Sequence, residues 1–108
     1  MATVSLDGAH IDDAASFHAA AQIAFGFPDF YGHTMDALVD CLSYLRDEDA
    51  MSSIRLGEQE VLTIELLHAD ALRQKAPELL EEISYLIEAI NERYADYGEC
   101  AALKLLLR

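Results

Sequence analysis

Residues 60–67 read Glu-Val-Leu-Thr-Ile-Glu-Leu-Leu, a mostly apolar run with two β-branched side chains at its centre. A short apolar run of this kind is typical of a central strand that is covered on both faces of its sheet. We therefore predict that residues 60–67 form the middle strand of the fold, covered on both faces, and we place the other elements around it.

Two further strands are expected at the ends of the chain. Residues 2–6 alternate in polarity and stop at Asp7-Gly8, which is a turn signal, and residues 101–107 are rich in leucine. Helical patterns separate these strands from the central one, and helical crossovers are typical of parallel strands with right-handed connections. The sequence thus predicts an α/β fold with a three-stranded parallel sheet in the order β-α-α-β-α-α-β.

Four segments have the signals of helices. In the first, Asp12 and Asp13 offer N-terminal carboxylates, while Thr34 can cap the second and Pro77 suits the first turn of the last. Residues 47–59 are polar and predict a loop, with room for a helical turn near Met51. The predicted helices are residues 13–25, 34–46, 68–75 and 77–95.

Composition and charge limit the classes of function. The chain has 108 residues, enough for one domain over residues 1–108, and 53% of them are hydrophobic. Twenty acidic against seven basic residues give a net charge of −13, which repels nucleic acid and anionic membranes and attracts basic proteins. Residues 1–10 lack the features of an export signal. We expect a cytoplasmic protein that is a monomer when free.

The most informative polar residues are Asp36 and Asp40, which are four positions apart on the predicted helix 34–46 and so share one face. Two carboxylates at this spacing repel each other. Between Asp29 and Asp49 there are six acidic residues and a single basic one, Arg46. This face is either a solvated acidic surface or a patch that presents carboxylates to cationic groups.

Signals of catalysis and cofactor binding are weak. Cys41 and Cys100 have no disulfide or zinc spacing, and both are expected to be reduced thiols in apolar surroundings. A thiol enzyme built on Cys41 remains an alternative, as does a metal site of His33 with Asp36 and Asp40, although that set is poor for hard and soft metals alike. We expect no cofactor and no metal, and we expect that the chain is not an enzyme.

One stretch has a specific likeness. Residues 27–42 read Phe-Pro-Asp-Phe-Tyr-Gly-His-Thr-Met-Asp-Ala-Leu-Val-Asp-Cys-Leu. This string resembles the barstar family of ribonuclease inhibitors, chiefly through Pro28, Tyr31-Gly32, residues 36–38 and residues 40–42. Val39 stands where the family commonly has Trp, and Phe30 stands in place of the usual Tyr.

The resemblance implies a three-stranded parallel sheet with helices packed on it. It also implies that the second helix and the preceding loop enter the active site of a basic bacterial ribonuclease or a related toxin. There Asp40 would occupy the phosphate site, Asp36 would meet further cationic or histidine groups, and Phe30 would stack near the catalytic histidine. A non-inhibitory acidic interaction module with the same fold is the alternative. The expected partner-binding residues are Phe30, Tyr31, Gly32, His33, Asp36, Val39, Asp40 and Tyr44.

Overall fold

A computed structural model describes residues 2–28, 31–46 and 54–108. Three parallel strands, β1 (Ala2–Asp7), β2 (Leu62–Leu67) and β3 (Leu103–Leu107), form one sheet in that order, with Val4, Ile64 and Leu105 side by side in the register. The predicted strand-and-helix order is confirmed, with an added 3₁₀ turn after β1. The elements are β1 (Ala2–Asp7), η1 (Gly8–His10), α1 (Ala14–Phe25), α2 (Met35–Leu42), β2 (Leu62–Leu67), α3 (Ala69–Lys75), α4 (Pro77–Asp96) and β3 (Leu103–Leu107).

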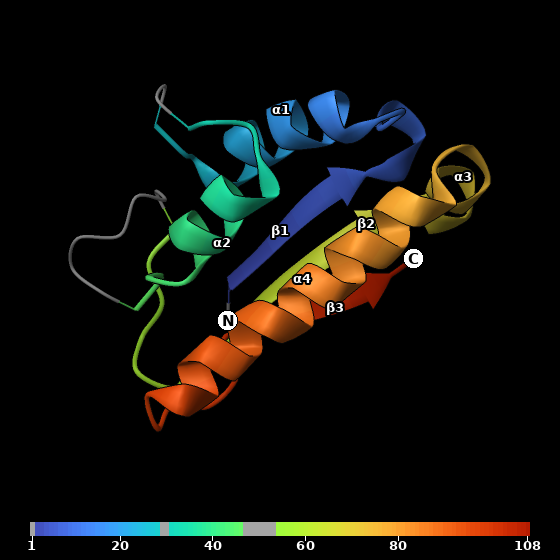
Figure 1. Cartoon of the computed structure of the whole chain (residues 1–108). Coiled ribbons are helices and arrows are strands. Elements are labelled where there is room, and N and C mark those ends of the chain that lie inside the picture. Colours follow the sequence, from blue (N-terminus) through green and yellow to red (C-terminus); the bar gives the residue numbers. More distant parts are fainter. Residues whose placement is uncertain (1, 29–30, 47–53) are drawn as a thin grey trace.

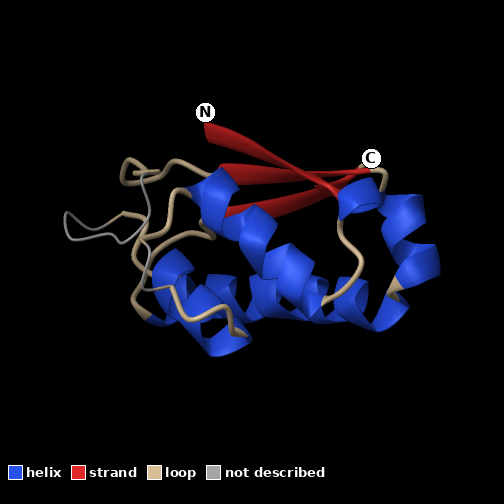
Figure 2. Cartoon of the chain, turned by 90° about the horizontal axis from the view of Figure 1, so that it is seen from above, coloured by secondary structure: helices blue, strands red, loops and turns tan. Residues whose placement is uncertain are grey.

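The sheet is covered on one face, so the prediction that residues 60–67 are buried on both faces is wrong. Helices α1, α2 and α4 all lie on the same side of the strands (Figure 2). Along β2, Leu62, Ile64 and Leu66 face the helices and are buried, whereas Thr63, Glu65 and Leu67 alternate with them and are only partly buried. The two polar residues at these positions keep the outer face compatible with water, which a count of apolar residues does not reveal.

The core lies between the sheet and the helices, with α4 in front of β2 and β3 and its axis running nearly along the strands (Figure 1). Burial of these side chains removes apolar surface from water and provides the main driving force for folding. Among the described helices, none is both long and apolar enough to cross a membrane. The largest side chains with almost no exposure are Ile11, Phe17, Phe25, Leu42, Leu45, Leu62, Leu66, Leu72 and Ile90.

The predicted helix ends are confirmed on the N-terminal side. Asp13 and Ser16 form a reciprocal capping box at α1, the Thr34 hydroxyl accepts a hydrogen bond from the Ala37 N–H at α2, and Pro77 opens α4. Gly26 ends α1 in the left-handed conformation with φ of 66°, which a residue without Cβ adopts at no steric cost.

Helix α2 ends at Leu42, four residues earlier than predicted. The Tyr94 hydroxyl donates to the Leu42 carbonyl at 2.8 Å and accepts from the Leu45 N–H at 3.0 Å. This hydroxyl from α4 satisfies backbone groups that a longer helix would have paired internally. The expected helical turn near Met51 lies outside the described residues.

Candidate functional site: an acidic face on the second helix

The acidic patch, defined here as Asp36 and Asp40, projects from α2 into solvent. Asp36 lies in the first turn of the helix, where the positive end of the helix dipole favours an anion. Both residues are exposed, and the side chain of Asp40 is 63% accessible. On the opposite side of α2, Leu38, Cys41 and Leu42 are buried against the core. The amphipathic pattern read from the sequence therefore presents both carboxylates outward.

Arg46, the single base among the six neighbouring acids, does not neutralise the patch. Its side chain is only 5% exposed, and its guanidinium donates to the carbonyls of Cys100 at 2.8 Å and Glu60 at 2.9 Å. It also forms an ion pair with Glu99 at 3.4 Å and lies over the ring of Tyr94. Arg46 thus joins the turn after α2 to the segments that precede β2 and β3, and its charge is directed into the protein.

A second arginine lies closer to the patch. The Nη1 atom of Arg93, on α4, is 3.9 Å from Oδ1 of Asp40, and the two side chains are 39% and 63% exposed. A solvated pair at this distance contributes little and does not cancel the carboxylate. Within the part of the chain that the structure describes, no basic side chain forms an ion pair with Asp36. The patch therefore keeps most of its negative charge available to a partner.

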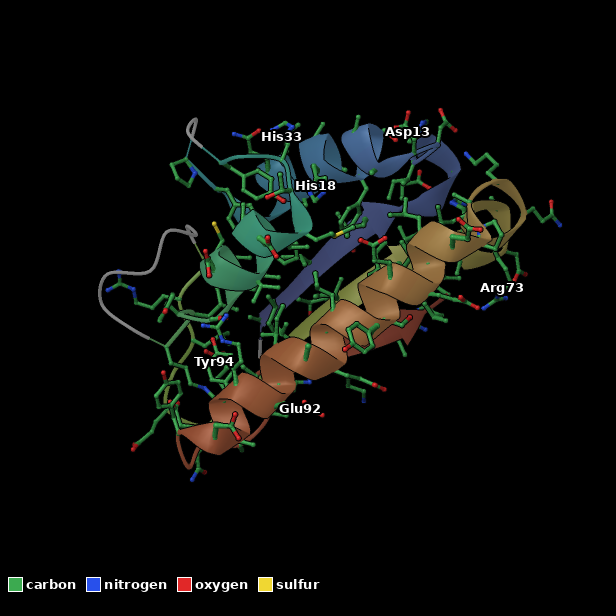
Figure 3. All side chains as sticks on the ribbon, in the orientation of Figure 1. Asp13, His18, His33, Arg73, Glu92 and Tyr94 are labelled. Carbon is green, nitrogen blue, oxygen red and sulfur yellow. The ribbon has the colours of Figure 1, made fainter. Side chains whose placement is uncertain are left out.

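The loop before α2 is held to α1 by side-chain hydrogen bonds. Gln22 of α1 donates from its amide nitrogen to the carbonyl of Pro28 at 3.0 Å, which leaves its amide oxygen to accept from Nε2 of His33 at 2.7 Å. This pairing places the His33 proton on Nε2. His33 has a positive φ of 52°, a strained conformation that the Gln22 bond helps to maintain. The rings of His18, on α1, and His33 lie close together, with 6.3 Å between their centroids (Figure 3).

Tyr31 anchors the same loop from inside the core. Its ring is 5% exposed and packs against Phe27, with 4.8 Å between the ring centroids. Its hydroxyl is 2.6 Å from Nδ1 of His18, which is 2% exposed. Burial, followed by the nearby His33, lowers the pKa of His18, and burial raises the pKa of Tyr31. A direct contact between the Tyr31 side chain and a partner would need this ring to leave the core.

The other expected site residues are distributed around the patch. Gly32 and His33 are exposed just before α2, Val39 is partly buried beside Asp40, and Tyr44 is 41% exposed after the helix. Phe30 lies outside the described residues. Helix α2, which carries both carboxylates, lies at one end of the molecule (Figure 1), and the exposed loop residues and Tyr44 directly precede and follow this helix in the chain.

Sequence reasoning missed two contributors to this region. Gln22 follows His18 by four residues on a predicted helix, and this spacing indicates that both face the same neighbour, here the loop. No comparable signal exists for Arg93, because only the packing of α4 beside α2 brings it near Asp40.

The alternative chemistries find little support. Cys41 is 4% exposed, and burial, with the nearby charge of Asp40, raises the pKa of its thiol, which disfavours the nucleophilic thiolate. Cys100 is exposed rather than in apolar surroundings, so that prediction is wrong. Within residues 2–28, 31–46 and 54–108, no group of three His, Cys, Asp or Glu side chains has the arrangement of a metal site.

Comparison with known proteins gives a family for this arrangement. No curated protein matches the chain. The family model described as barstar, the barnase inhibitor, matches residues 1–105, which covers all three strands and all four α-helices apart from the last residues of β3. The sheet topology and the acidic α2 agree with the likeness read from residues 27–42. The chain belongs to the barstar family.

Proposed function

We propose that this protein inhibits a basic bacterial ribonuclease, or a related toxin, by placing α2 and the loop before it in the enzyme's active site. Membership of the barstar family supports a ribonuclease partner in general. The observation that carries the specific proposal is the exposure of Asp36 and Asp40 on one face of α2, with Arg46 turned away from them.

The mechanism is imitation of RNA phosphates by carboxylates. An enzyme that binds RNA gathers cationic side chains around the phosphate position, and a rigidly held carboxylate can occupy that position without being cleaved. Asp40 fills this role, and Asp36, one helical turn earlier, contacts neighbouring cationic groups. The mutual repulsion of the two aspartates destabilises the free helix slightly, and binding to a cationic pocket removes it.

The flanking residues shape the rest of the interface. Gly32, His33 and Val39 border the patch, Tyr44 provides an exposed aromatic surface, and Phe30 stacks near the catalytic histidine of the enzyme. Tyr31 contributes by fixing the loop from the core rather than by touching the partner. Because Pro28 and His33 are tied to Gln22 of α1 before binding, these two positions lose little conformational entropy when the complex forms.

The net charge adds a kinetic contribution. A surface with a net charge of −13 attracts a basic enzyme over distances comparable to the Debye length and raises the association rate. We expect the protein to act as a monomer in the cytoplasm, where Cys41 and Cys100 stay reduced.

The test is titration calorimetry of wild type and Asp40→Ala against a panel of basic bacterial ribonucleases, at low and moderate salt. Loss of one member of a buried, hydrogen-bonded charge pair costs about 2–5 kcal/mol, so we expect at least a roughly 30-fold weaker complex, mainly through faster dissociation. Asp70→Ala is the matched control, because Asp70 is 90% exposed on α3 and its loss changes the net charge equally.

The outcomes separate the candidate functions. Equal affinity of wild type and Asp40→Ala for the enzyme rejects the phosphate-mimic mechanism. Failure to bind any ribonuclease of the panel, with the fold intact, favours a non-inhibitory acidic interaction module.

A further inference from the structure

Arg93 is a cation at the border of the acidic patch. It projects from α4 and forms an ion pair with Asp40, with 3.9 Å between Nη1 of Arg93 and Oδ1 of Asp40. A guanidinium has five N–H donors and is always charged, so one long contact uses little of its capacity. With a side-chain exposure of 39%, Arg93 is accessible to anything that docks on Asp40.

A groove of about 330 Å³ is lined by Arg93. Its walls include Tyr44, from the turn after α2, and Tyr97, at the end of α4, which are 41% and 77% exposed. Arg46 and Glu99 also line it, and these two are paired with each other at 3.4 Å. The charges of Arg46 and Glu99 therefore balance, and Arg93 supplies the accessible positive charge of the groove.

This arrangement places a condition on the partner. A cationic group that sits on Asp40 comes close to the guanidinium of Arg93, and the two like charges repel each other when water is excluded. The repulsion is relieved when the partner also brings a negative charge to Arg93. An arginine suits that role because its planar donors match a carboxylate in a two-pronged pair.

We propose that the groove lined by Arg93 receives an acidic side chain of the ribonuclease, which pairs with this arginine. This inference rests on the proposed function and adds a rule of partner choice to it. The patch takes cationic groups at Asp36 and Asp40, while the groove, which Tyr44 and Tyr97 help to line, takes one carboxylate. The tyrosine walls offer apolar area and hydroxyl groups, a combination typical of interface cores. Arg93 then discriminates against nucleases whose site is purely cationic.

The test is whether the substitution Arg93→Gln weakens or strengthens binding to the ribonuclease. The probe is the ribonuclease of the panel that binds wild type most tightly, and the measurement is its dissociation constant by calorimetry with Arg93→Gln. We expect at least tenfold weaker binding, although the variant is more acidic and its partner is basic. If Arg93 served only to shield Asp40, its removal would strengthen binding instead.

Two further variants complete the design. Arg73→Gln is the matched control, because Arg73 is 54% exposed on α3, pairs with Asp70 and alters the net charge equally; we expect it not to weaken binding. Arg93→Lys keeps the charge without the two-pronged geometry, and we expect an affinity between those of wild type and Arg93→Gln. Substitution of acidic residues around the nuclease site should reveal one whose loss is not additive with Arg93→Gln.

The results distinguish this inference from the function on which it rests. Weaker binding by Asp40→Ala together with equal or tighter binding by Arg93→Gln leaves inhibition standing and overturns the role of Arg93. Absence of binding to every ribonuclease of the panel overturns both proposals. Weaker binding by both variants, with Arg73→Gln unaffected, supports both.

Discussion

The hydroxyl of Tyr94 offers the sharpest test of how α2 is held in place. The change Tyr94→Phe removes one oxygen and keeps the ring, its packing and the position of Arg46 over it, 5.2 Å from the ring centroid. That oxygen joins the Leu42 carbonyl at 2.8 Å to the Leu45 N–H at 3.0 Å. Its loss therefore affects the backbone just after the helix that carries Asp40.

The expected magnitude follows from burial. Tyr94, Leu42 and Leu45 are 4%, 2% and 0% exposed, so water does not readily replace the missing hydroxyl. Leaving a buried backbone donor or acceptor without a partner costs about 1–3 kcal/mol. Two such groups are affected and local relaxation recovers part of the loss, so we expect the free energy of unfolding to fall by about 2–4 kcal/mol.

The assay is urea unfolding followed by circular dichroism, with Tyr85→Phe as the control. Tyr85 lies on the same helix and is 71% exposed, so loss of its hydroxyl should change stability by less than about 0.5 kcal/mol. The dependence of the free energy on urea should match wild type in both variants. A Tyr94→Phe protein as stable as Tyr85→Phe would refute the conclusion that this hydroxyl terminates α2.

Two other predictions concern titratable side chains. Burial lowers the pKa of His18, so the folded protein favours the neutral form of this side chain. The resulting contribution to stability is present at pH values above 6.5, the pKa of the side chain in the unfolded chain, and should be lost as the pH falls below 6.5. Between pH 8 and 5, the free energy of unfolding measured in urea should fall less for His18→Gln than for wild type. An equal fall in both proteins would contradict the conclusion that folding favours neutral His18. The two thiols should differ in reactivity, since Cys41 is buried with a raised pKa and Cys100 is exposed. With Ellman's reagent, one thiol should react quickly in the native protein and the second only after denaturation; Cys100→Ser should abolish the fast phase, and a fast phase that persists would contradict this order.

The acidic face and the order of the elements were predictable because both depend on local sequence. The spacing of Asp36 and Asp40 places them on one side of any helix that contains them, and apolar Leu38 and Leu42 fix the opposite side as the buried one. Caps such as Thr34 also act within a few residues, so the start of α2 was predicted to within one position.

Features that depend on packing were not predictable in this way. The end of α2 is set by Tyr94 from another helix, and the sheet is open on one face because α1, α2 and α4 all pack on the other. Apolar content in β2 does not say how many layers cover it, since a partly exposed face tolerates Thr63 and Glu65 as well as Leu67.

For the candidate site, helical periodicity alone was enough to predict which carboxylates lie together, because a helix fixes the relative direction of residues four positions apart. Which cations accompany these carboxylates depends on how separate elements pack. Arg46, their neighbour in sequence, turns inward to backbone carbonyls, and Arg93, distant in sequence, lies beside Asp40. The partners of a long, flexible arginine side chain depend on how separate elements pack, and the periodicity of the local sequence does not predict that packing.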